Sequence, residues 1–175
     1  MELYLIRHTT PDIDRSICYG QTDLPLKNTF QEEAQVILDQ LPQWFGRIYS
    51  SPLIRCHTLA QTIPTNDLIV EPRLRELSFG QWEMQPWKEI PTEDLDRWKQ
   101  NFVYEAPPEG ESITDLRDRV MSWWDEVRSE QDSPLAIVAH FAVIRVFMAT
   151  LQNIPLERVF SMERMEYGAV FRLNV

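Results

Sequence analysis

The sequence contains few glycines, few cysteines and no long apolar run. Its five glycines are too widely spaced to form a glycine-rich loop around a phosphate. Two cysteines are too few for a disulfide framework and are typical of a reducing compartment. No segment reaches the roughly 20 apolar residues of a membrane-spanning helix, and the first residues lead into a strand rather than a signal peptide. We therefore expect a cytoplasmic protein that does not bind membranes.

The chain is strongly acidic, with 27 Asp and Glu residues, 17 Lys and Arg residues and a net charge of −10. This balance disfavours nucleic acid and anionic membranes as partners, because both select basic surfaces. An anionic substrate therefore needs a local cluster of positive groups. The length of 175 residues and the hydrophobic content of 43% predict a single domain covering residues 1–175.

Two kinds of catalytic centre are disfavoured by residue spacing. The histidines, His8, His57 and His140, show no metal-ligand spacing and no accompanying Cys/His cluster, so we expect neither a metal nor another cofactor. Neither cysteine is followed six residues later by an arginine, since Leu24 and Thr62 stand there. This excludes the arrangement of the cysteine-dependent phosphatases.

Three short apolar runs end next to cationic or imidazole side chains. The first precedes Arg7 and His8, the second precedes His140, and the third is followed by Arg55 in the next predicted helix. In open α/β sheets, ligands bind beyond the carboxyl ends of the strands. Guanidinium groups match phosphate oxygens, and imidazole can act as a nucleophile or a proton donor. These side chains together suit a phosphoryl group.

The hydrophobic pattern alternates between strands and helices, which predicts an α/β fold. We expect strands at about residues 2–7, 47–50, 68–71, 135–139 and 169–174. The expected architecture is a three-layer α/β/α sandwich with a mostly parallel sheet. The last strand carries polar Arg172 and Asn174 on one face, so we expect it to be an antiparallel edge strand.

Helix starts are predicted from capping residues. Thr29 with Glu32 predicts a capping box for the first helix. Ser51 and Pro52 predict an N-cap and a first-turn proline for the second helix, which places Arg55 near its positive end. Two further helices are expected at about residues 112–130 and 142–151.

The segment at about residues 81–110 is rich in aromatic residues and proline. We expect it to form an irregular helical excursion over the site. The sequence leaves open whether its tryptophans belong to the core or contact an aromatic substrate.

Five segments, in order along the chain, resemble the histidine phosphatase superfamily, also called the phosphoglycerate mutase-like family. They are LIRH at residues 5–8, SSPLIR at 50–55, LRELSFGQWE at 74–83, PEGES at 108–112 and IVAH at 137–140.

The resemblance implies a role for each site residue. His8 attacks phosphorus and becomes a phosphohistidine, while Arg7, Arg55 and His140 hold the phosphoryl group. Glu76 protonates the leaving group, with Glu83 as its nearest competitor. This chemistry needs no metal.

Within the family, residues 7–12 and 18–26 most resemble the α-ribazole phosphatases. This implies hydrolysis of α-ribazole 5′-phosphate, a small phosphomonoester of cobalamin biosynthesis. Tyr19 and Gln21 are candidates for substrate contact, and a purely structural role in the turn is the alternative. The competing functions are a broad-specificity small-molecule phosphatase, a phosphoglycerate mutase and a non-catalytic phosphate-binding protein. Whether the protein forms a homodimer is left open.

The chain departs from the family at three glycine positions. Thr9 follows the first histidine, Phe141 follows the second, and Met84 follows the Trp-Glu pair. Glycine permits positive φ angles and a close approach of ligand to backbone. We therefore do not carry over the backbone contacts of the family, and we expect Phe141 to narrow the pocket.

Overall fold

The computed structural model describes residues 1–130 and 134–175. Within these ranges, five strands form one sheet in the order β3-β2-β4-β1-β5. Strands β1 to β4 pair in parallel, and β5 pairs antiparallel with β1. The strands are β1 (Glu2–Arg7), β2 (Arg47–Ser50), β3 (Leu68–Val70), β4 (Leu135–Ala139) and β5 (Val170–Asn174). The predicted mostly parallel sheet with an antiparallel edge strand is confirmed.

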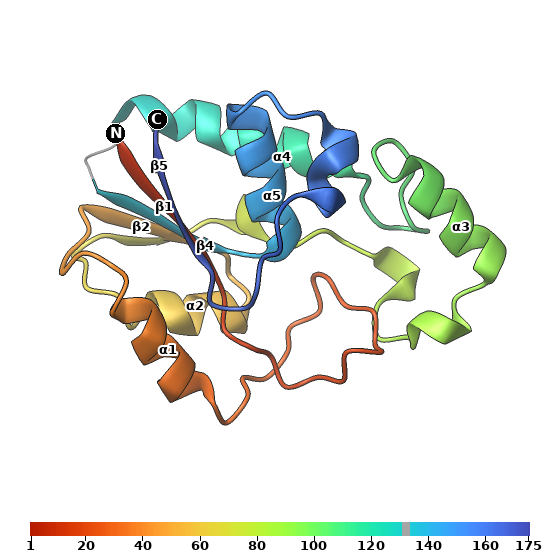
Figure 1. Ribbon diagram of the computed structural model, residues 1–175, viewed down its shortest axis with the longest axis horizontal. Coiled ribbons are helices and arrows are strands. Elements are labelled where there is room, and N and C mark those ends of the chain that lie inside the picture. The colour runs from red at the N-terminus through yellow and green to blue at the C-terminus, as the bar shows by residue number, and fades with distance from the viewer. Residues whose placement is uncertain (131–133) are drawn as a thin grey trace.

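Helices cover both faces of the sheet (Figure 1). One face carries α4 (Ile113–Val127) and α5 (Phe141–Leu151), and the other carries α1 (Phe30–Leu38) and α2 (Ile54–Ala60). The three-layer α/β/α arrangement is therefore confirmed. Within the described residues, no helix combines the length and apolar character needed to cross a membrane.

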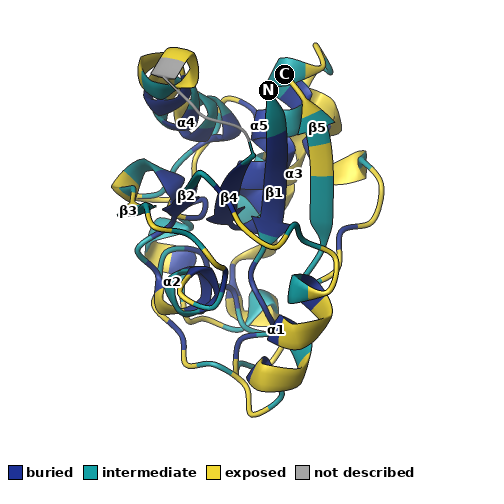
Figure 2. Cartoon of the chain, turned by 90° about the vertical axis from the view of Figure 1, so that its left-hand side faces the viewer, coloured by how far each residue is buried: buried dark blue, intermediate teal, exposed yellow. Residues whose placement is uncertain are grey.

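Alternating side chains of β1 feed two cores. Leu3 and Leu5 pack into the cluster under α4 and α5, whereas Tyr4 and Ile6 pack into the cluster under α1 and α2. Every residue of β4 is buried, because this strand lies between β2 and β1. Figure 2 shows these central strands as buried and β5 as partly exposed. On β5, Arg172 and Asn174 are exposed, as predicted for an edge strand.

The predicted capping box at α1 is wrong. Thr29 precedes the helix, but its hydroxyl donates to Oε1 of Glu33 (2.6 Å) instead of engaging Glu32. The other oxygen of Glu33 accepts from the backbone N–H of Thr10 (2.8 Å). A tertiary contact with the loop after β1 therefore replaces the local cap.

The predicted start of α2 is also wrong. The helix begins at Ile54 with Leu53 as its N-cap, so Ser51 and Pro52 lie outside it. The Ser51 hydroxyl accepts from the Leu53 N–H (3.3 Å), which makes a short turn before the helix. Arg55 still lies in the first turn of α2, as expected.

The segment between β3 and α4 is irregular and helical. It contains the 3-10 helices η1 (Pro72–Leu74), η2 (Gly80–Trp82) and η3 (Trp87–Glu89), followed by α3 (Thr92–Asn101). Helix α3 stands apart from the sheet in Figure 1. That residues 1–175 form one domain, with this excursion over the site, stays a prediction.

The two ends of the excursion meet at a glycine. Gly80 has a φ of +53°, and a Cβ there would lie 2.1 Å from the Pro108 carbonyl oxygen. A larger residue would therefore clash with the backbone on which this close approach depends. The contact ties the start of the excursion to the segment that leads into α4.

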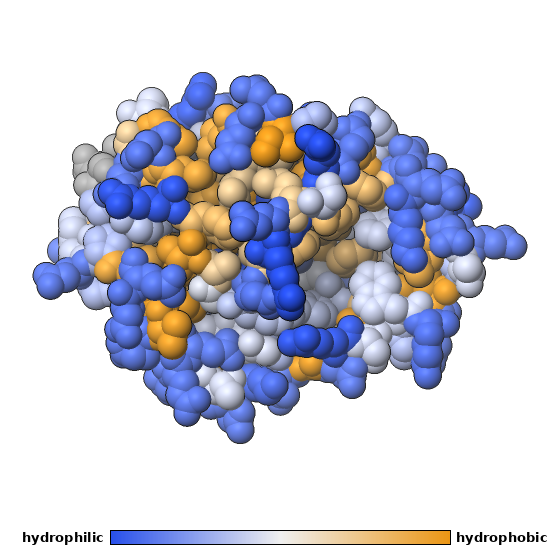
Figure 3. Space-filling model, in the orientation of Figure 1, coloured by the Kyte–Doolittle hydropathy of each residue, from blue (hydrophilic) through white to orange (hydrophobic). Residues whose placement is uncertain are grey.

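The order of the strands brings three carboxyl ends together. Because β4 lies between β1 and β2, the residues that follow these strands share one edge of the sheet. They include His8, Ser51 and His140. In the space-filling view of Figure 3, hydrophilic side chains cover most of the periphery, and patches of apolar side chains lie among hydrophilic ones on the rest of the face.

Candidate active site

His8 follows β1 and is buried, with 2% of its surface exposed. Its Nδ1 lies 2.7 Å from the carbonyl oxygen of Thr9. A carbonyl can only accept, so Nδ1 carries the proton and Nε2 of the neutral ring carries a lone pair. Burial, and then the charges of Arg55 and Arg7, hold the pKa of His8 well below its usual value. The imidazole is therefore neutral and can act as a nucleophile.

Arg55 projects from the first turn of α2 and is fully buried. Its guanidinium donates to the carbonyl oxygens of Gly20 (2.6 Å) and Thr22 (3.0 Å). Within the described residues, no carboxylate lies within ion-pair distance of Arg55. Its positive charge is held in place by carbonyl groups and is not neutralised by an acid.

Arg7, at the end of β1, is held in a similar way. It donates to the Met165 carbonyl (2.6 Å), and its guanidinium carbon lies 4.1 Å from the ring centroid of Tyr167. Its Nε is buried and lacks a hydrogen-bond partner among the described residues. Burial lowers the pKa of Arg7 from its ordinary value. An anion bound here would restore the interactions that the guanidinium lost on leaving water.

Two tyrosines cover these groups. The hydroxyls of Tyr19 and Tyr167 lie 2.6 Å apart. The Tyr167 ring is 5.6 Å from the His8 ring, and the Tyr19 ring is 5.6 Å from the guanidinium carbon of Arg55. Burial and the hydrogen bond to Tyr167 raise the pKa of Tyr19. The pair thus covers His8 and Arg55. That Tyr19 contacts substrate stays a prediction.

Tyr167 was not predicted from the sequence. It precedes β5 without belonging to any recognised motif. Its placement follows from topology, because the amino end of an antiparallel strand lies at the same edge as the carboxyl ends of its parallel neighbours. Gly168 donates to the His8 carbonyl (3.1 Å), which fixes this proximity.

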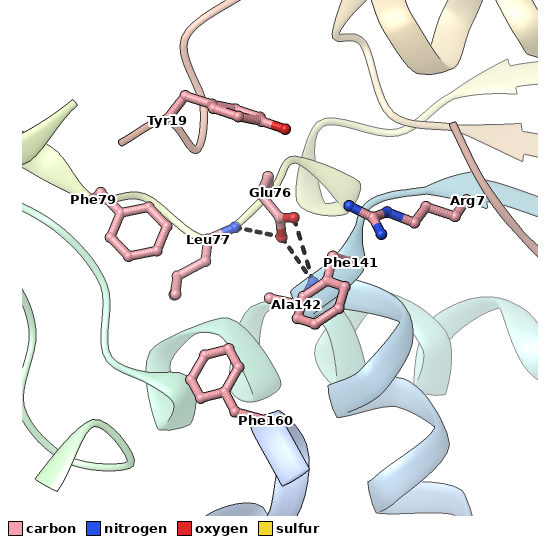
Figure 4. A pocket seen from close by; sticks show the side chains of 8 residues that line it. All are labelled: Arg7, Tyr19, Glu76, Leu77, Phe79, Phe141, Ala142 and Phe160. Carbon is pink, nitrogen blue, oxygen red and sulfur yellow. Dashed lines mark hydrogen bonds between the residues drawn. The ribbon is translucent and has the colours of Figure 1, made fainter. Parts of the chain in front are cut away.

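Glu76 lies beyond η1 and faces the same cavity as Arg7 (Figure 4). Its Oε1 accepts from the backbone N–H of Leu77 (2.9 Å) and of Ala142 (3.2 Å). Burial raises the pKa of Glu76, although these hydrogen bonds and the charge of Arg55 oppose the shift. A carboxyl group that keeps its proton more readily is suited to general acid catalysis.

Glu83 has a different environment. Its carboxylate accepts from the backbone N–H of Gln21 (2.9 Å), Thr22 (2.7 Å) and Phe79 (3.1 Å), and from the Thr22 hydroxyl. Burial raises its pKa, but the hydrogen bonds outweigh burial and the net effect is a lowered pKa. Glu83 is therefore poorly suited to donate a proton, which favours Glu76 as the acid.

His140 follows β4, and its ring centroid lies 5.1 Å from that of His8. Its Nε2 is 2.8 Å from the Ser51 hydroxyl, which explains why Ser51 does not cap α2. Burial and the nearby charge of Arg55 hold the pKa of His140 well below its usual value. The ring is neutral, and its role in holding the phosphoryl group stays a prediction.

The side chain of Gln21 makes its hydrogen bonds to other residues of the protein. Its side-chain amide donates to the Glu76 carbonyl (3.0 Å) and to the carboxylate of Glu111 (3.4 Å). Gln21 is not among the residues that line the cavity. Its predicted contact with substrate stays untested, and the observed contacts hold the backbone of Glu76.

The cavity has a volume of about 240 Å³. It is lined by Arg7, Tyr19, Glu76, Leu77, Phe79, Phe141, Ala142 and Phe160. In this lining the charged side chains are Arg7 and Glu76, and most of the other walls are apolar. Phe141 faces the cavity in Figure 4. That it narrows the pocket stays a prediction.

The tryptophans of the excursion lie elsewhere. Trp82 is buried with Cys18 and Ile90 in a satellite core, and Trp87 and Trp98 pack against it. None of the three lines the cavity. The structure therefore favours their interpretation as core residues over contact with an aromatic substrate.

Within the described residues, no group of three His, Cys, Asp or Glu side chains could hold a metal ion.

Comparison with known proteins gives a consistent family. A family model described as histidine phosphatase superfamily (branch 1) matches residues 3–175. "Putative phosphoserine phosphatase 2" of Hydrogenobacter thermophilus is 30% identical over 167 residues, covering 91% of this chain and 82% of that protein. "Probable phosphoglycerate mutase GpmB" of Escherichia coli is 30% identical over 166 residues, covering 89% and 76%. The structure of the α-ribazole phosphatase from Shigella flexneri superposes with a TM-score of 0.82 at 25% identity, covering 100% and 91%.

Proposed function

Because the chain belongs to the histidine phosphatase superfamily, we propose that it is a metal-independent phosphomonoesterase that acts through a phosphohistidine at His8. One observation carries the proposal. The Thr9 carbonyl fixes the proton of His8 on Nδ1, so the lone pair of Nε2 is available beside Arg7 and Arg55. Among the described residues, neither arginine has a carboxylate within ion-pair distance. A neutral imidazole next to uncompensated guanidinium groups is suited to attack a phosphate monoester.

The first step forms the phosphoenzyme. Nε2 of His8 attacks phosphorus, a P–N bond forms, and the P–O bond to the leaving group breaks. Glu76 gives its proton to the departing oxygen, so the leaving group departs as an alcohol. Arg7, Arg55 and His140 stabilise the charge on the remaining phosphoryl oxygens.

The second step regenerates the enzyme. The Glu76 carboxylate takes a proton from a water molecule, whose oxygen attacks phosphorus. The P–N bond breaks, inorganic phosphate is released, and His8 returns to its neutral state. Glu76 ends the cycle protonated, as it began.

We assign α-ribazole 5′-phosphate as the preferred substrate, which places the enzyme in cobalamin biosynthesis. Two observations support this assignment. Residues 7–12 and 18–26 resemble the α-ribazole phosphatases, and the fold is similar to that of the Shigella flexneri enzyme. The cavity also supports it. Apart from Arg7, its described lining contains no cation to pair with a carboxylate on the leaving group. This favours a neutral leaving group over phosphoglycerate or phosphoserine.

The alternative functions are a phosphoglycerate mutase and a broad-specificity phosphatase. The relative from Escherichia coli named as a mutase motivates the first, although this chain spans 76% of its length. A mutase retains the phosphohistidine against water, so assaying 3-phosphoglycerate for phosphate release and for isomerisation separates the two activities.

A phosphoenzyme experiment tests the proposed chemistry. Rapid acid-free quenching with a labelled aryl phosphate should trap a stoichiometric, acid-labile adduct in the wild-type protein and none in His8→Ala. Turnover should be abolished in His8→Ala and should survive exhaustive EDTA treatment in the wild type. A stoichiometric adduct in His8→Ala would place the nucleophile elsewhere. Loss of activity with EDTA, restored by a divalent ion, would contradict the metal-free mechanism.

A substrate panel tests the assigned substrate. We expect a higher kcat/KM for α-ribazole 5′-phosphate than for ribose 5-phosphate or 3-phosphoglycerate. The first comparison isolates the base, because both substrates carry the phosphate on a ribose 5′ oxygen. Equal kcat/KM values for these two would show that the base is not recognised, and the broad-specificity alternative would then hold.

A further inference from the structure

Three phenylalanines form a wall of the cavity that contains Glu76 (Figure 4). Phe79 comes from the segment after Glu76, Phe141 begins α5, and Phe160 lies in η5 (Leu156–Ser161). The rings of Phe141 and Phe160 are nearly parallel, with 12° between their planes and 6.4 Å between their centroids. Three distant parts of the chain thus place aromatic rings around one space.

The leaving group must occupy this space. A general acid has to lie within hydrogen-bond reach of the oxygen that it protonates. Glu76 lines the cavity, whereas the nucleophile His8 does not. Since the attacking and leaving atoms lie roughly in line on opposite sides of phosphorus, the part of the ester beyond its oxygen extends past Glu76 towards the phenylalanines.

The wall favours a flat apolar group. A charged leaving group would lose its hydration here. Among the described residues that line the cavity, Arg7 is the only cation, and it faces the phosphoryl group in the proposed mechanism. An aromatic ring would bury apolar area and could adopt offset or edge-to-face contacts with the surrounding rings. The chemistry of the lining therefore selects for a planar ring.

Arg145 holds two of the three rings in place. It is 3% exposed, and it donates to the carbonyl oxygens of Val159 (2.5 Å) and Glu163 (2.8 Å), on either side of Phe160. Its guanidinium carbon lies 4.2 Å from the Phe141 ring centroid. A single buried cation thus fixes both the segment that carries Phe160 and the ring of Phe141. Side chains fixed in this way lose little freedom when a ligand binds.

We propose that Phe79, Phe141 and Phe160 form a subsite for a planar ring in the leaving group of the phosphomonoester, with Arg145 as its positioning residue. The inference rests on the proposed phosphatase function. It deepens that function by assigning ring recognition to these side chains. The tryptophans of the excursion do not line the cavity. Trp98 packs behind the wall instead, with its ring centroid 5.8 Å from that of Phe79 and 6.0 Å from that of Phe160. Phe141 stands where the resemblance to the family implies glycine, so the wall includes a ring that glycine would not supply.

A matched pair of substrates tests the subsite. Benzyl phosphate and cyclohexylmethyl phosphate are both esters of primary alcohols with a six-membered ring on the same carbon, and they differ in whether that ring is flat. We expect the wild-type kcat/KM for benzyl phosphate to exceed that for cyclohexylmethyl phosphate by about 3- to 10-fold, the scale of the extra affinity between aromatic pairs. Equal values would overturn the proposal, because they would indicate apolar burial alone.

Variants test which side chains cause the preference for the flat ring of benzyl phosphate. Phe160→Leu changes a side chain that is 37% exposed, so the variant should fold. We expect it to reduce the ratio of kcat/KM for benzyl phosphate to kcat/KM for cyclohexylmethyl phosphate to near one. Phe141→Leu and Arg145→Met should do the same, with thermal unfolding used to confirm folding. The ratio cancels effects common to both substrates, so a merely structural role of Arg145 would leave it unchanged. Tyr104→Leu, at a 70% exposed position that does not line the cavity, is the control and should keep the wild-type ratio.

Failure of the subsite and failure of the proposed function give different results. A ratio that persists in both Phe160→Leu and Phe141→Leu would place ring recognition elsewhere. If the wild type hydrolyses neither these esters nor the aryl phosphate and α-ribazole 5′-phosphate, the phosphatase proposal fails instead. Calorimetric binding of benzylphosphonate and cyclohexylmethylphosphonate then decides the subsite without turnover. Preferential binding of the benzyl compound, lost in Phe160→Leu, supports it, and equal binding overturns it.

Discussion

Glu76 and Glu83 show how the environment separates two carboxylates that are seven residues apart. Glu76 is buried at the cavity, where loss of water raises its pKa. Glu83 is surrounded by backbone and hydroxyl donors that lower its pKa. Sequence spacing alone permits either as the acid, whereas the hydrogen bonds assign them different tasks.

We therefore predict that the effect of Glu76→Gln on kcat depends on the leaving group of the substrate. Removing a general acid should lower kcat by roughly 10²- to 10⁴-fold for alkyl phosphates. The loss should be smaller for p-nitrophenyl phosphate, whose leaving group departs without a proton. The measurement is kcat for both substrates, with Glu93→Gln on exposed α3 as the control. Near wild-type rates of Glu76→Gln on both substrates would assign the acid to another residue.

At this scale, motif residues were predictable and residues without a motif were not. Five predicted residues come together as expected, because each lies at or next to the end of a regular element: Arg7, His8, Arg55, Glu76 and His140. Two aromatic residues come from the C-terminal segment, where no local pattern marks them: Tyr167 lies beside His8 and Arg7, and Phe160 lines the cavity. Their positions depend on the antiparallel pairing of β5 and on the contacts of Arg145.

Met84 resolves one departure from the family. It occupies a position where the family usually has glycine, and its φ is +64°. The backbone thus keeps the left-handed conformation that glycine favours, even though the side chain has changed. Its N–H donates to the Cys18 carbonyl (2.7 Å), so the close contact between the two segments holds this conformation in place.

At the scale of elements, the turn at residues 20–22 connects Arg55 to the segment that carries Glu76 and Glu83. Glu83 accepts hydrogen bonds from Gln21 and Thr22, which fixes the turn. The carbonyl groups of Gly20 and Thr22 in turn accept from Arg55. Gly20 is needed there, because a Cβ would lie 2.0 Å from the Leu77 carbonyl oxygen. Glu83 is thereby linked to Arg55 through the turn.

A double-mutant cycle tests this connection. Glutamine has one acceptor oxygen, and its NH₂ group would oppose the backbone donors, so Glu83→Gln should loosen the turn. We expect it to raise the inhibition constant of inorganic phosphate by about 10-fold, in line with buried donors left unsatisfied. Arg55→Met should raise it further, and the double variant should be no worse than Arg55→Met alone.

Additive effects in this cycle would mean that Glu83 and Arg55 act independently. The thermal midpoint of each variant should be measured alongside, because a general loss of stability would affect all backgrounds equally. Non-additivity restricted to phosphate inhibition identifies positioning of Arg55 as the cause.

Strands were easier to predict than helix starts for a physical reason. A buried parallel strand is a continuous apolar run, so β1, β2 and β4 are visible directly in the sequence. A capping side chain can instead bind a distant group. Glu33 binds Thr10 and Ser51 binds His140, and neither partner is apparent from local spacing.

Over the whole molecule, a net charge of −10 coexists with buried positive and neutral groups at one edge of the sheet. Folding takes His8 and His140 out of water next to Arg55, and both keep pKa values well below the usual range. The folded protein therefore resists protonation of either ring. Below about pH 6.5, the ordinary pKa of histidine, the unfolded chain takes up protons that the folded state does not.

Stability should consequently fall as the pH decreases below about 6.5. Each histidine contributes up to about 1.4 kcal/mol per pH unit between its unfolded and folded pKa values. Glu76 acts in the opposite direction, because its raised pKa lets the folded state keep a proton that the unfolded chain releases above about pH 4.5. The slope of the free energy of unfolding against pH, measured for the wild type alone, thus combines opposing contributions from the histidines and Glu76.

Comparison with His8→Asn isolates one histidine, because Glu76 and His140 remain in both proteins. Urea unfolding at pH 7.5, 6.5, 5.5 and 5.0 gives the free energy of unfolding at each pH. We expect the two proteins to have similar slopes above pH 6.5. Below it, the wild type should lose stability more steeply, by up to about 1.4 kcal/mol per pH unit. Equal slopes over the whole range would show that His8 gains a proton in the folded state as readily as in the unfolded chain. That result would contradict a neutral, buried nucleophile held between two arginines.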